Sequence, residues 1–322
     1  EQCKAAPRLV LEVLDRRSVM MDELRELVES EFGATCKVPQ NPARATQLGA
    51  IRRAAALTKG MPQPQWTQVE KMALAARILA GQGHGHTLSG QITCRTDNAD
   101  GSEVFMWTQA YGTALELIRP SDFVRINSNL EVVEGTGFPN LATRFHLHVY
   151  RERPDIKCAV HTHSPWTSAL AMTGEPLEIG HMDTMALFGR VAHLPAWPGV
   201  PFGNEEGEII SGSLGKDHLA VLAGHHGLFV GGRTIEEATY LAYFFEHAAK
   251  MQLRARAAMN GKPFPKVVEP TARRARDWRI MDGPVKAHFN SWARQVIASG
   301  QNPLTQTDEE VCAGVTCFGS HA

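Results

Sequence analysis

The sequence predicts an α/β protein whose main domain is a three-layer α-β-α sandwich with a mostly antiparallel central sheet. Short apolar runs of strand length alternate with stretches of helical spacing along the 322 residues. In the first half of the body these runs come in pairs joined by turn residues, which indicates hairpins and therefore antiparallel strands. Long amphipathic patterns, such as the one after Thr234, supply helices that would cover the sheet.

Three segments are expected along the chain. Residues 1–64 form a helical N-terminal extension, because two patterns of helical spacing, at 10–32 and 45–57, are each followed by a proline-containing linker. Residues 65–260 form the body that carries the sheet. Residues 261–322 form a helical C-terminal extension, rich in arginine and tryptophan at first and ending in a polar tail.

The first half of the body predicts one helix and several short strands. Thr67 and Glu70 have the spacing of a capping box, so a helix is expected from there through residue 80. The glycine-rich stretch 81–90 predicts a loop on the ligand side that leads into a strand. Further strands are expected at 104–108, 120–126 and 130–133, with a hairpin turn at 97–102.

The second half alternates helices and strands. A helix is expected at 140–153, ending before Pro154, and a strand at 156–161. Ser164 is a candidate N-cap with Pro165 in the first helical position. The remaining expectations are a short helix at 205–214, a strand at 219–223 and a long helix from the capping box at 234–237 to residue 258. Residues 194–201 contain too much proline for a central strand.

Two histidine motifs, each at the end of an expected strand, indicate a metal site. His161 and His163 are two residues apart, so on a strand their side chains lie on the same face. A second stretch, 222–227, repeats the order of apolar run, histidine and glycine. Neutral imidazole is the commonest metal ligand among side chains. Alone, a His-x-His pair also fits two unrelated histidines, and His84 and His86 of the glycine-rich loop fit either ligands or surface residues.

Composition argues against several classes of protein. The formal net charge is −1 with acidic and basic residues interspersed, so neither nucleic acid nor an anionic membrane is expected as a partner. No apolar run approaches the roughly 20 residues that span a bilayer. The six cysteines include no Cys-x-x-Cys pair, which favours free thiols in a reducing cytoplasm. Because the first residue is Glu1, an upstream targeting segment cannot be judged.

Residues 68–254 resemble the class II aldolase/adducin family, whose familiar members include fuculose-phosphate aldolase. The resemblance rests on the Leu-Ser-Gly-Gln loop at 88–91, the helix segment 144–150, the strand 159–164 and the Gly-His-His-Gly turn at 224–227. It implies that His161, His163 and His226 bind a divalent ion, usually zinc, with Fe(II), Mn or Co as alternatives. The ion would act as a Lewis acid that stabilises an enolate-like intermediate of a small-molecule substrate. It also implies a homo-oligomer, commonly a tetramer, with sites at subunit interfaces.

The chain departs from the sugar-phosphate aldolases of this family at the positions that handle protons and phosphate. The acid/base carboxylate expected four residues before His146 is Ala142, and a methyl group cannot exchange a proton. The paired serines that hold phosphate fall at Asn140 and Leu141, which argues against a phosphorylated sugar. The replacement candidates for catalysis are His146, His181 and Asp183. The candidate substrate contacts are Ser89, Gly90, Gln91, Asn140 and Arg144.

Three functions compete. The first is a metal-dependent lyase, an aldolase or decarboxylase, acting on a non-phosphorylated hydroxy, keto or aromatic carboxylic acid. The second is a non-heme Fe(II) oxygenase on the same scaffold, which metal analysis and oxygen-consumption assays would distinguish. The third is a non-catalytic, adducin-like interaction module, which unchanged partner binding after alanine substitution of the three histidines would favour.

Overall fold

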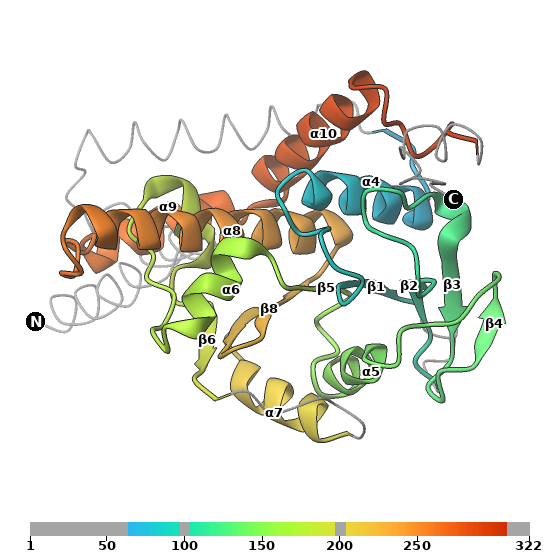
Figure 1. Cartoon of the computed structure of the whole chain (residues 1–322), viewed down its shortest axis with the longest axis horizontal. Helices are drawn as coiled ribbons and strands as arrows, with labels where there is room; N and C mark the ends of the chain where they lie inside the picture. The colour runs from blue at the N-terminus through green and yellow to red at the C-terminus, as the bar shows by residue number, and fades with distance from the viewer. Residues whose placement is uncertain (1–63, 97–102, 197–203, 308–322) are drawn as a thin grey trace, which may run out of the picture.

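The structure is a computed structural model that describes residues 64–96, 103–196 and 204–307 (Figure 1). The two helices expected at 10–32 and 45–57, the turn at 97–102 and the end of the tail lie outside the described residues. The three segment boundaries stay predictions. None of the described helices combines the length and the apolar character needed to traverse a lipid bilayer.

An eight-stranded sheet, in the order β4-β3-β2-β1-β5-β8-β7-β6, forms the centre of the described part of the chain. All neighbouring strands are antiparallel except the edge pair β6 and β7, which is parallel. The strands are β1 (Gln91–Arg95), β2 (Met106–Gln109), β3 (Phe123–Ile126), β4 (Val132–Glu134), β5 (Cys158–Thr162), β6 (Val191–Leu194), β7 (Ala220–Ala223) and β8 (Gly227–Gly232). The predicted, mostly antiparallel sheet is therefore confirmed.

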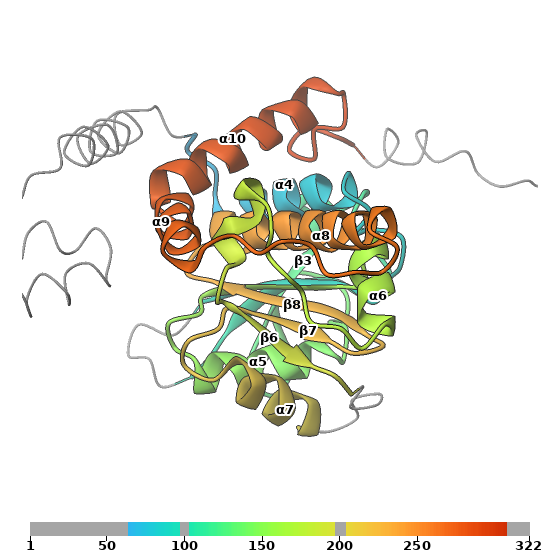
Figure 2. The ribbon, with the colours of Figure 1, turned by 90° about the vertical axis from the view of Figure 1, so that its left-hand side faces the viewer.

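Helices cover both faces of this sheet, which confirms the three-layer sandwich (Figure 2). On one face α4 and α8 pack on the strands and α10 packs on these two helices, while α5 and α7 cover the other face. The α-helices are α4 (Gln68–Ala80), α5 (Thr143–Glu152), α6 (Pro165–Met172), α7 (Glu205–Leu214), α8 (Ile235–Ala258), α9 (Glu269–Arg279) and α10 (Asp282–Ala298). Two short 3₁₀ helices are η1 (Pro120–Asp122) and η2 (Met182–Leu187).

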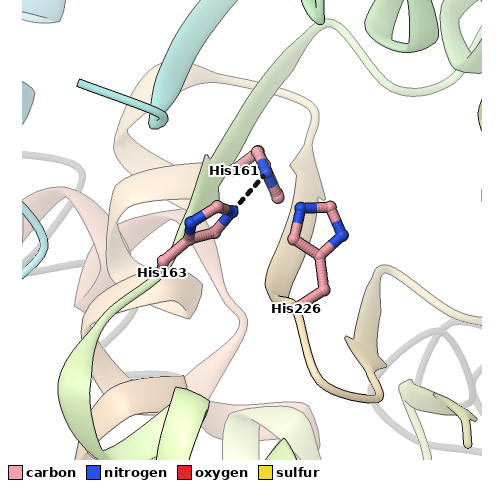
Figure 3. Close-up of side chains that lie close together, drawn as sticks. All are labelled: His161, His163 and His226. Atoms are coloured by element: carbon pink, nitrogen blue, oxygen red, sulfur yellow. Dashed lines mark hydrogen bonds between the residues drawn. The ribbon is translucent and has the colours of Figure 1, made fainter. Parts of the chain in front are cut away.

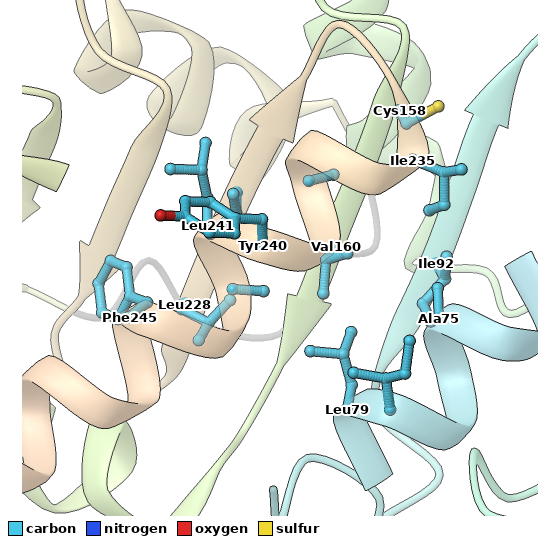
Figure 4. Packing of buried hydrophobic residues seen from close by; sticks show 14 of the residues in the cluster. Ala75, Leu79, Ile92, Cys158, Val160, Leu228, Ile235, Tyr240, Leu241 and Phe245 are labelled. Atoms are coloured by element: carbon cyan, nitrogen blue, oxygen red, sulfur yellow. The ribbon is translucent and has the colours of Figure 1, made fainter. Parts of the chain in front are cut away.

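The alternation of side chains along β5 separates two apolar cores. Val160 points into the core shared with α4 and α8, where Leu79 and Leu241 also lie (Figure 4). Ala159, its neighbour, belongs to the second core, beneath α5 and α7. Burying each large aliphatic side chain contributes about 1.5–3 kcal/mol, so a one-residue slip of β5 would exchange the two faces at high cost. This alternation places His161 on the α5 and α7 face of the sheet.

Local sequence signals explain where several elements begin. The capping box of α4 forms as predicted, with the Glu70 carboxylate accepting from the backbone N–H of Thr67 at 2.7 Å. At α8 the box is half formed, because the Glu237 carboxylate accepts from the N–H of Arg233 instead, at 2.7 Å. The helix expected at 205–214 has those bounds.

One of two expectations about strand positions requires correction. The strand expected from residue 120 begins at Phe123, because Pro120 opens a 3₁₀ turn that precedes it. The expectation that the proline-rich region 194–201 holds no central strand agrees with its described part, since β6 lies at the sheet edge and ends at Leu194, before Pro195. Its position at the sheet edge is compatible with the proline that follows, since an edge strand can end where an N–H donor is missing.

Candidate metal centre

Three imidazole rings converge at the ends of β5 and β8 (Figure 3). One ligand atom from each of His161, His163 and His226 lies within 4.8 Å of the others. The Nε2 atoms of His161 and His163 are 3.2 Å apart. Two nitrogens bound to one tetrahedral zinc ion at 2.0–2.1 Å would lie about 3.3 Å apart. The spacing of this pair therefore fits a shared metal ion.

The β7–β8 hairpin brings His226 to the end of β5. Its turn places His225 at φ 53°, a left-handed conformation that is uncommon for a residue with a side chain. Gly227 sits so close to β5 that an added Cβ would lie 2.4 Å from the carbonyl oxygen of Thr162. Only glycine permits this approach, and it sets the imidazole of His226 beside that of His163, with ring centres 4.7 Å apart.

A backbone hydrogen bond fixes the tautomer of His161. Its Nδ1 lies 2.8 Å from the carbonyl oxygen of Leu228, an acceptor, so Nδ1 carries the proton. The lone pair is then on Nε2, which faces His163 (Figure 3). A carbonyl on the outer nitrogen is the arrangement by which proteins orient metal-binding histidines.

Burial keeps all three rings neutral. It lowers the pKa of His161 well below the ordinary 6.5, and the neighbouring His226 and His163 add to the effect. Burial likewise lowers the pKa of His163, and it lowers that of His226 to about 4. Neutral imidazole is the form that binds a metal ion, so the three rings are ready to act as ligands at neutral pH.

Comparison with known proteins identifies the family. The family model described as "Class II Aldolase and Adducin N-terminal domain" matches residues 70–253, more than half of the chain. The chain belongs to the class II aldolase and adducin family. The expected resemblance is confirmed.

Relatives within the class II aldolase and adducin family carry different names. The meiotically up-regulated gene 14 protein of Schizosaccharomyces pombe is 30% identical over 184 residues, 56% of this chain and 70% of that protein. The 4-hydroxy-3-prenylphenylpyruvate oxygenase/4-hydroxy-3-prenylbenzoate synthase of Streptomyces roseochromogenus subsp. oscitans is 26% identical, over 60% of this chain and 69% of its own. Decarboxylase NovR of Streptomyces niveus is 28% identical over a match that covers 59% of this chain and 70% of that protein.

Among solved structures, the L-fuculose 1-phosphate aldolase from Glaciozyma antarctica PI12 is similar to this chain with a TM-score of 0.65. The two sequences are 25% identical, and the match covers 78% of this chain and 99% of the aldolase. The same family therefore includes aldolases and a decarboxylase, so membership alone does not assign the reaction of this chain.

In this class II aldolase family member, helix α6 begins two residues after His163, and its start is capped by a residue of another helix. Ser164 occupies the predicted N-cap position, but its hydroxyl donates to the Glu246 carboxylate of α8 at 2.7 Å. The same carboxylate accepts from the backbone N–H groups of Trp166 and Thr167, both at 2.8 Å. Glu246 thus satisfies the unpaired N–H groups of the helix start and fixes the chain next to His163.

His146 lies on the same face of the sheet as the three histidines. Its ring centre is 6.5 Å from that of His161, and Phe145 packs against both rings. The Nδ1 atom of His146 is 2.8 Å from the hydroxyl of Thr93, which also bonds the Tyr150 hydroxyl at 2.7 Å. Its Nε2 is buried and has no hydrogen-bond partner among the described residues.

The predicted contacts from the first loop lie beside β5. Gln91 is paired with His161 across the β1–β5 ladder, and its side-chain amide donates to the carbonyl of Ser89 at 2.5 Å. A Cβ at Gly90 would lie 3.2 Å from the carbonyl oxygen of His161. Gly90 and Gln91 therefore pack against the backbone of β5, the strand that carries His161, while Ser89 is exposed next to it.

The predicted contacts on α5 lie at its first turn. The Asn140 side chain accepts from the N–H of Ala142 at 3.0 Å, so it closes the turn that starts the helix. Arg144 and Leu141 are exposed there, Leu141 by 73%.

His181 and Asp183 lie on the opposite side of the sheet from the three histidines. They belong to the start of η2, which packs against α8 and α9. The Asp183 carboxylate accepts a hydrogen bond from Arg279 of α9, and His181 is exposed. Within one chain these two residues do not join the metal centre, so the prediction that they act in catalysis requires a neighbouring copy.

Two acidic residues near the centre carried no sequence-based assignment. Glu206 of α7 is 3% exposed, its Oε1 lies 3.7 Å from Nδ1 of His226, and burial raises the pKa of its carboxyl to about 7. Glu246 contacts the start of α6 as described above. A glutamate on the apolar stripe of a predicted helix is a signal that could have singled out Glu206, since Ile210 and Leu214 continue that stripe.

Acid is expected to destabilise the metal-free protein, because its buried imidazoles stay neutral in the folded state but take up protons when the chain unfolds. Burial lowers the pKa of His84 and of His146 to about 3. The unfolded chain binds these protons near its ordinary pKa of 6.5, so the free energy of unfolding falls as the pH drops below that value. Between about pH 6.5 and pH 5, each of the two histidines lowers the free energy of unfolding by about 1.5 kcal/mol.

Glu206 acts in the opposite direction, since its raised pKa makes the folded state take up a proton below about pH 7. One carboxyl does not offset the buried histidines. Urea unfolding of chelator-treated protein at about pH 7 and about pH 5 measures the net change in the free energy of unfolding, which should be a decrease. A urea midpoint that stays level or rises on acidification would contradict the claim that these histidines are buried in their neutral form.

Proposed function

We propose that this family member is a divalent-metal-dependent lyase, an aldolase or decarboxylase, acting on a non-phosphorylated hydroxy, keto or aromatic carboxylic acid. The observation that carries the proposal is the convergence of His161, His163 and His226, with donor spacing that fits one ion. Zinc is the first choice of metal, and Fe(II), Mn or Co also accept nitrogen ligands. When bound, the ion would supply a Lewis acid for a carbonyl or carboxylate oxygen of the substrate.

The protein's own residues then have to move a proton, because Ala142 has no ionisable group. His146 supports this role best within one chain, since its ring lies 6.5 Å from that of His161 and its Nε2 is unpartnered among the described residues. His181 and Asp183 remain candidates if a homo-oligomer, a tetramer by family analogy, places them at a subunit interface next to the site.

The first turn of α5 supports the proposed substrate class. Asn140 uses its side-chain oxygen to close the turn, and Leu141 presents an apolar side chain to solvent. Neither offers the hydroxyl donors that would hold a phosphate group. The names of two relatives, a decarboxylase and a prenylbenzoate synthase, support an aromatic or keto acid.

Phosphorylated sugars are therefore expected to be poor substrates. Purified protein loaded with zinc should turn over fuculose 1-phosphate at less than about one hundredth of the rate with a suitable hydroxy or keto acid, a loss of about 2.7 kcal/mol in transition-state binding. A panel of both substrate classes, assayed for aldehyde, pyruvate or carbon dioxide release, measures this. Efficient cleavage of the phosphorylated sugar would show that the pocket holds phosphate by other residues.

A second function, a non-heme Fe(II) oxygenase, is favoured by one observation. The relative from Streptomyces roseochromogenus carries the name of an oxygenase, and the imidazole donor set of this chain suits Fe(II) as well as zinc. Metal analysis of protein purified without oxygen, followed by oxygen-electrode assays with keto acids, separates the two. Iron at one ion per chain with substrate-dependent oxygen uptake would replace the lyase proposal.

A further inference from the structure

The carboxyl group of Glu206 is buried beside the metal centre without a partner. Its side chain is 3% exposed, and neither carboxyl oxygen has a hydrogen bond within the described residues. The Nδ1 atom of His226 is buried and equally unpartnered, and it lies 3.7 Å from Oε1 of Glu206. An unpaired buried carboxyl is costly, so its presence here calls for a donor that it can bind.

The placement of Glu206 on its helix reinforces this point. Glu206, Ile210 and Leu214 are four residues apart and buried, so the carboxyl occupies one position of the apolar stripe of α7. An aliphatic residue there would pack without a desolvation penalty.

Close packing of α7 on α5 limits how far the carboxyl can move away. A Cβ on the next residue, Gly207, would lie 2.6 Å from the Cβ of His148. The two helices therefore approach at a distance that only glycine allows, which fixes the backbone that carries Glu206. The two atoms are 3.7 Å apart, so they need to approach by about 0.5–1 Å to reach hydrogen-bond distance.

His161 shows what such a partner does. Its outer nitrogen, Nδ1, donates to the carbonyl of Leu228 at 2.8 Å, and this leaves Nε2 free to face the centre. His226 has the same orientation, with one nitrogen turned to the other two rings and the other nitrogen turned away (Figure 3). The described residues place no backbone carbonyl within hydrogen-bond distance of its outer nitrogen, and Glu206 occupies that side.

We propose that Glu206 is a positioning residue whose carboxyl accepts the Nδ1 proton of His226 and so holds Nε2 toward the metal. Carboxylate partners of this kind orient the ring and increase the basicity of the ligand nitrogen. This inference rests on the proposed metal site but concerns a residue outside the ligand set.

The first test measures the affinity of the metal-free protein for Zn²⁺ in competition with a chromophoric chelator. Glu206→Ala is expected to weaken binding by roughly 10–100-fold. Glu206→Gln, whose amide oxygen still accepts a hydrogen bond, should remain within about threefold of the wild type. Glu205→Ala, a change at the exposed neighbour on the same helix, is the matched control and should bind normally. Wild-type affinity in Glu206→Ala would overturn the proposal.

The second test reads the tautomer of His226 directly, by nitrogen-15 NMR of the metal-free protein, with His226→Gln to assign the signal. The proton is expected on Nδ1 in the wild type and no longer fixed there in Glu206→Ala. A merely structural effect of Glu206 would not move this signal. A proton on Nε2 in the wild type would overturn the proposal.

The two tests also separate this inference from the proposed function. Wild-type protein that binds no Zn²⁺ would refute the metal centre, while the tautomer measurement would still decide whether Glu206 holds His226. If Glu206→Ala does not fold, Glu206→Met keeps a similar side-chain volume without an acceptor and serves for both measurements.

Discussion

Replacement of His163 with alanine is expected to remove the metal from the protein. His163 supplies the donor nearest to Nε2 of His161, at 3.2 Å, and its loss leaves two imidazoles for an ion that needs at least three protein ligands. The bound metal of the purified variant should fall below about one tenth of an ion per chain, and activity should fall with it. Elemental analysis after dialysis against a weak chelator measures the content.

His218→Ala is the matched control, because this histidine lies four residues after the end of α7, where its ring bonds the carbonyl of Leu214 at 3.2 Å. It removes one imidazole without touching the centre and should retain the wild-type metal content. Normal metal content in His163→Ala would mean that the ion, if present, is held elsewhere.

Replacement of Glu246 with alanine is expected to give the largest loss of stability among single changes near the site. The carboxylate is 4% exposed and accepts hydrogen bonds from the hydroxyls of Ser164 and Thr167 and from two backbone N–H groups at the start of α6. Removing it leaves these donors buried and unpaired, which should lower the free energy of unfolding by about 3 kcal/mol. Urea unfolding of the metal-free variant measures the change.

Glu208→Ala controls for the loss of a glutamate, because Glu208 is exposed on α7 and should change stability by less than about 0.5 kcal/mol. The stability of Glu246→Gln should lie between those of Glu246→Ala and Glu208→Ala. The glutamine amide oxygen can accept some of the hydrogen bonds, whereas its NH₂ group faces other donors. Equal stability of Glu246→Ala and Glu208→Ala would refute the capping role.

The sequence predicted the parts of the fold that depend on local patterns. Hairpin-like strand pairs and apolar stripes indicated the three-layer sandwich, and the bounds of α7 followed from its flanking signals. The histidine motifs also followed from local rules, because alternation on β5 sets His161 and His163 on one face. A glycine next to His226 indicated a tight turn, and the structure shows that Gly227 approaches β5 closely.

The features that the sequence did not predict depend on contacts between segments that are far apart along the chain. β6 escaped prediction because a short parallel edge strand followed by Pro195 has little pattern of its own. Asp183 was a candidate in the site, but Arg279, 96 residues away, pairs with it on the far side of the sheet. The cap on α6 comes from Glu246, 82 residues after Ser164, where the sequence suggested only the serine.

The most direct test is a crystal structure with diffraction data collected on both sides of the absorption edges of zinc and iron. The structure predicts a single anomalous peak about 2.1 Å from nitrogens of His161, His163 and His226, and the edge at which it appears names the metal. Any chelating molecule in the same map would identify the substrate class. A metal-loaded crystal with no peak among these three imidazoles would contradict the proposed centre and leave only the layered fold.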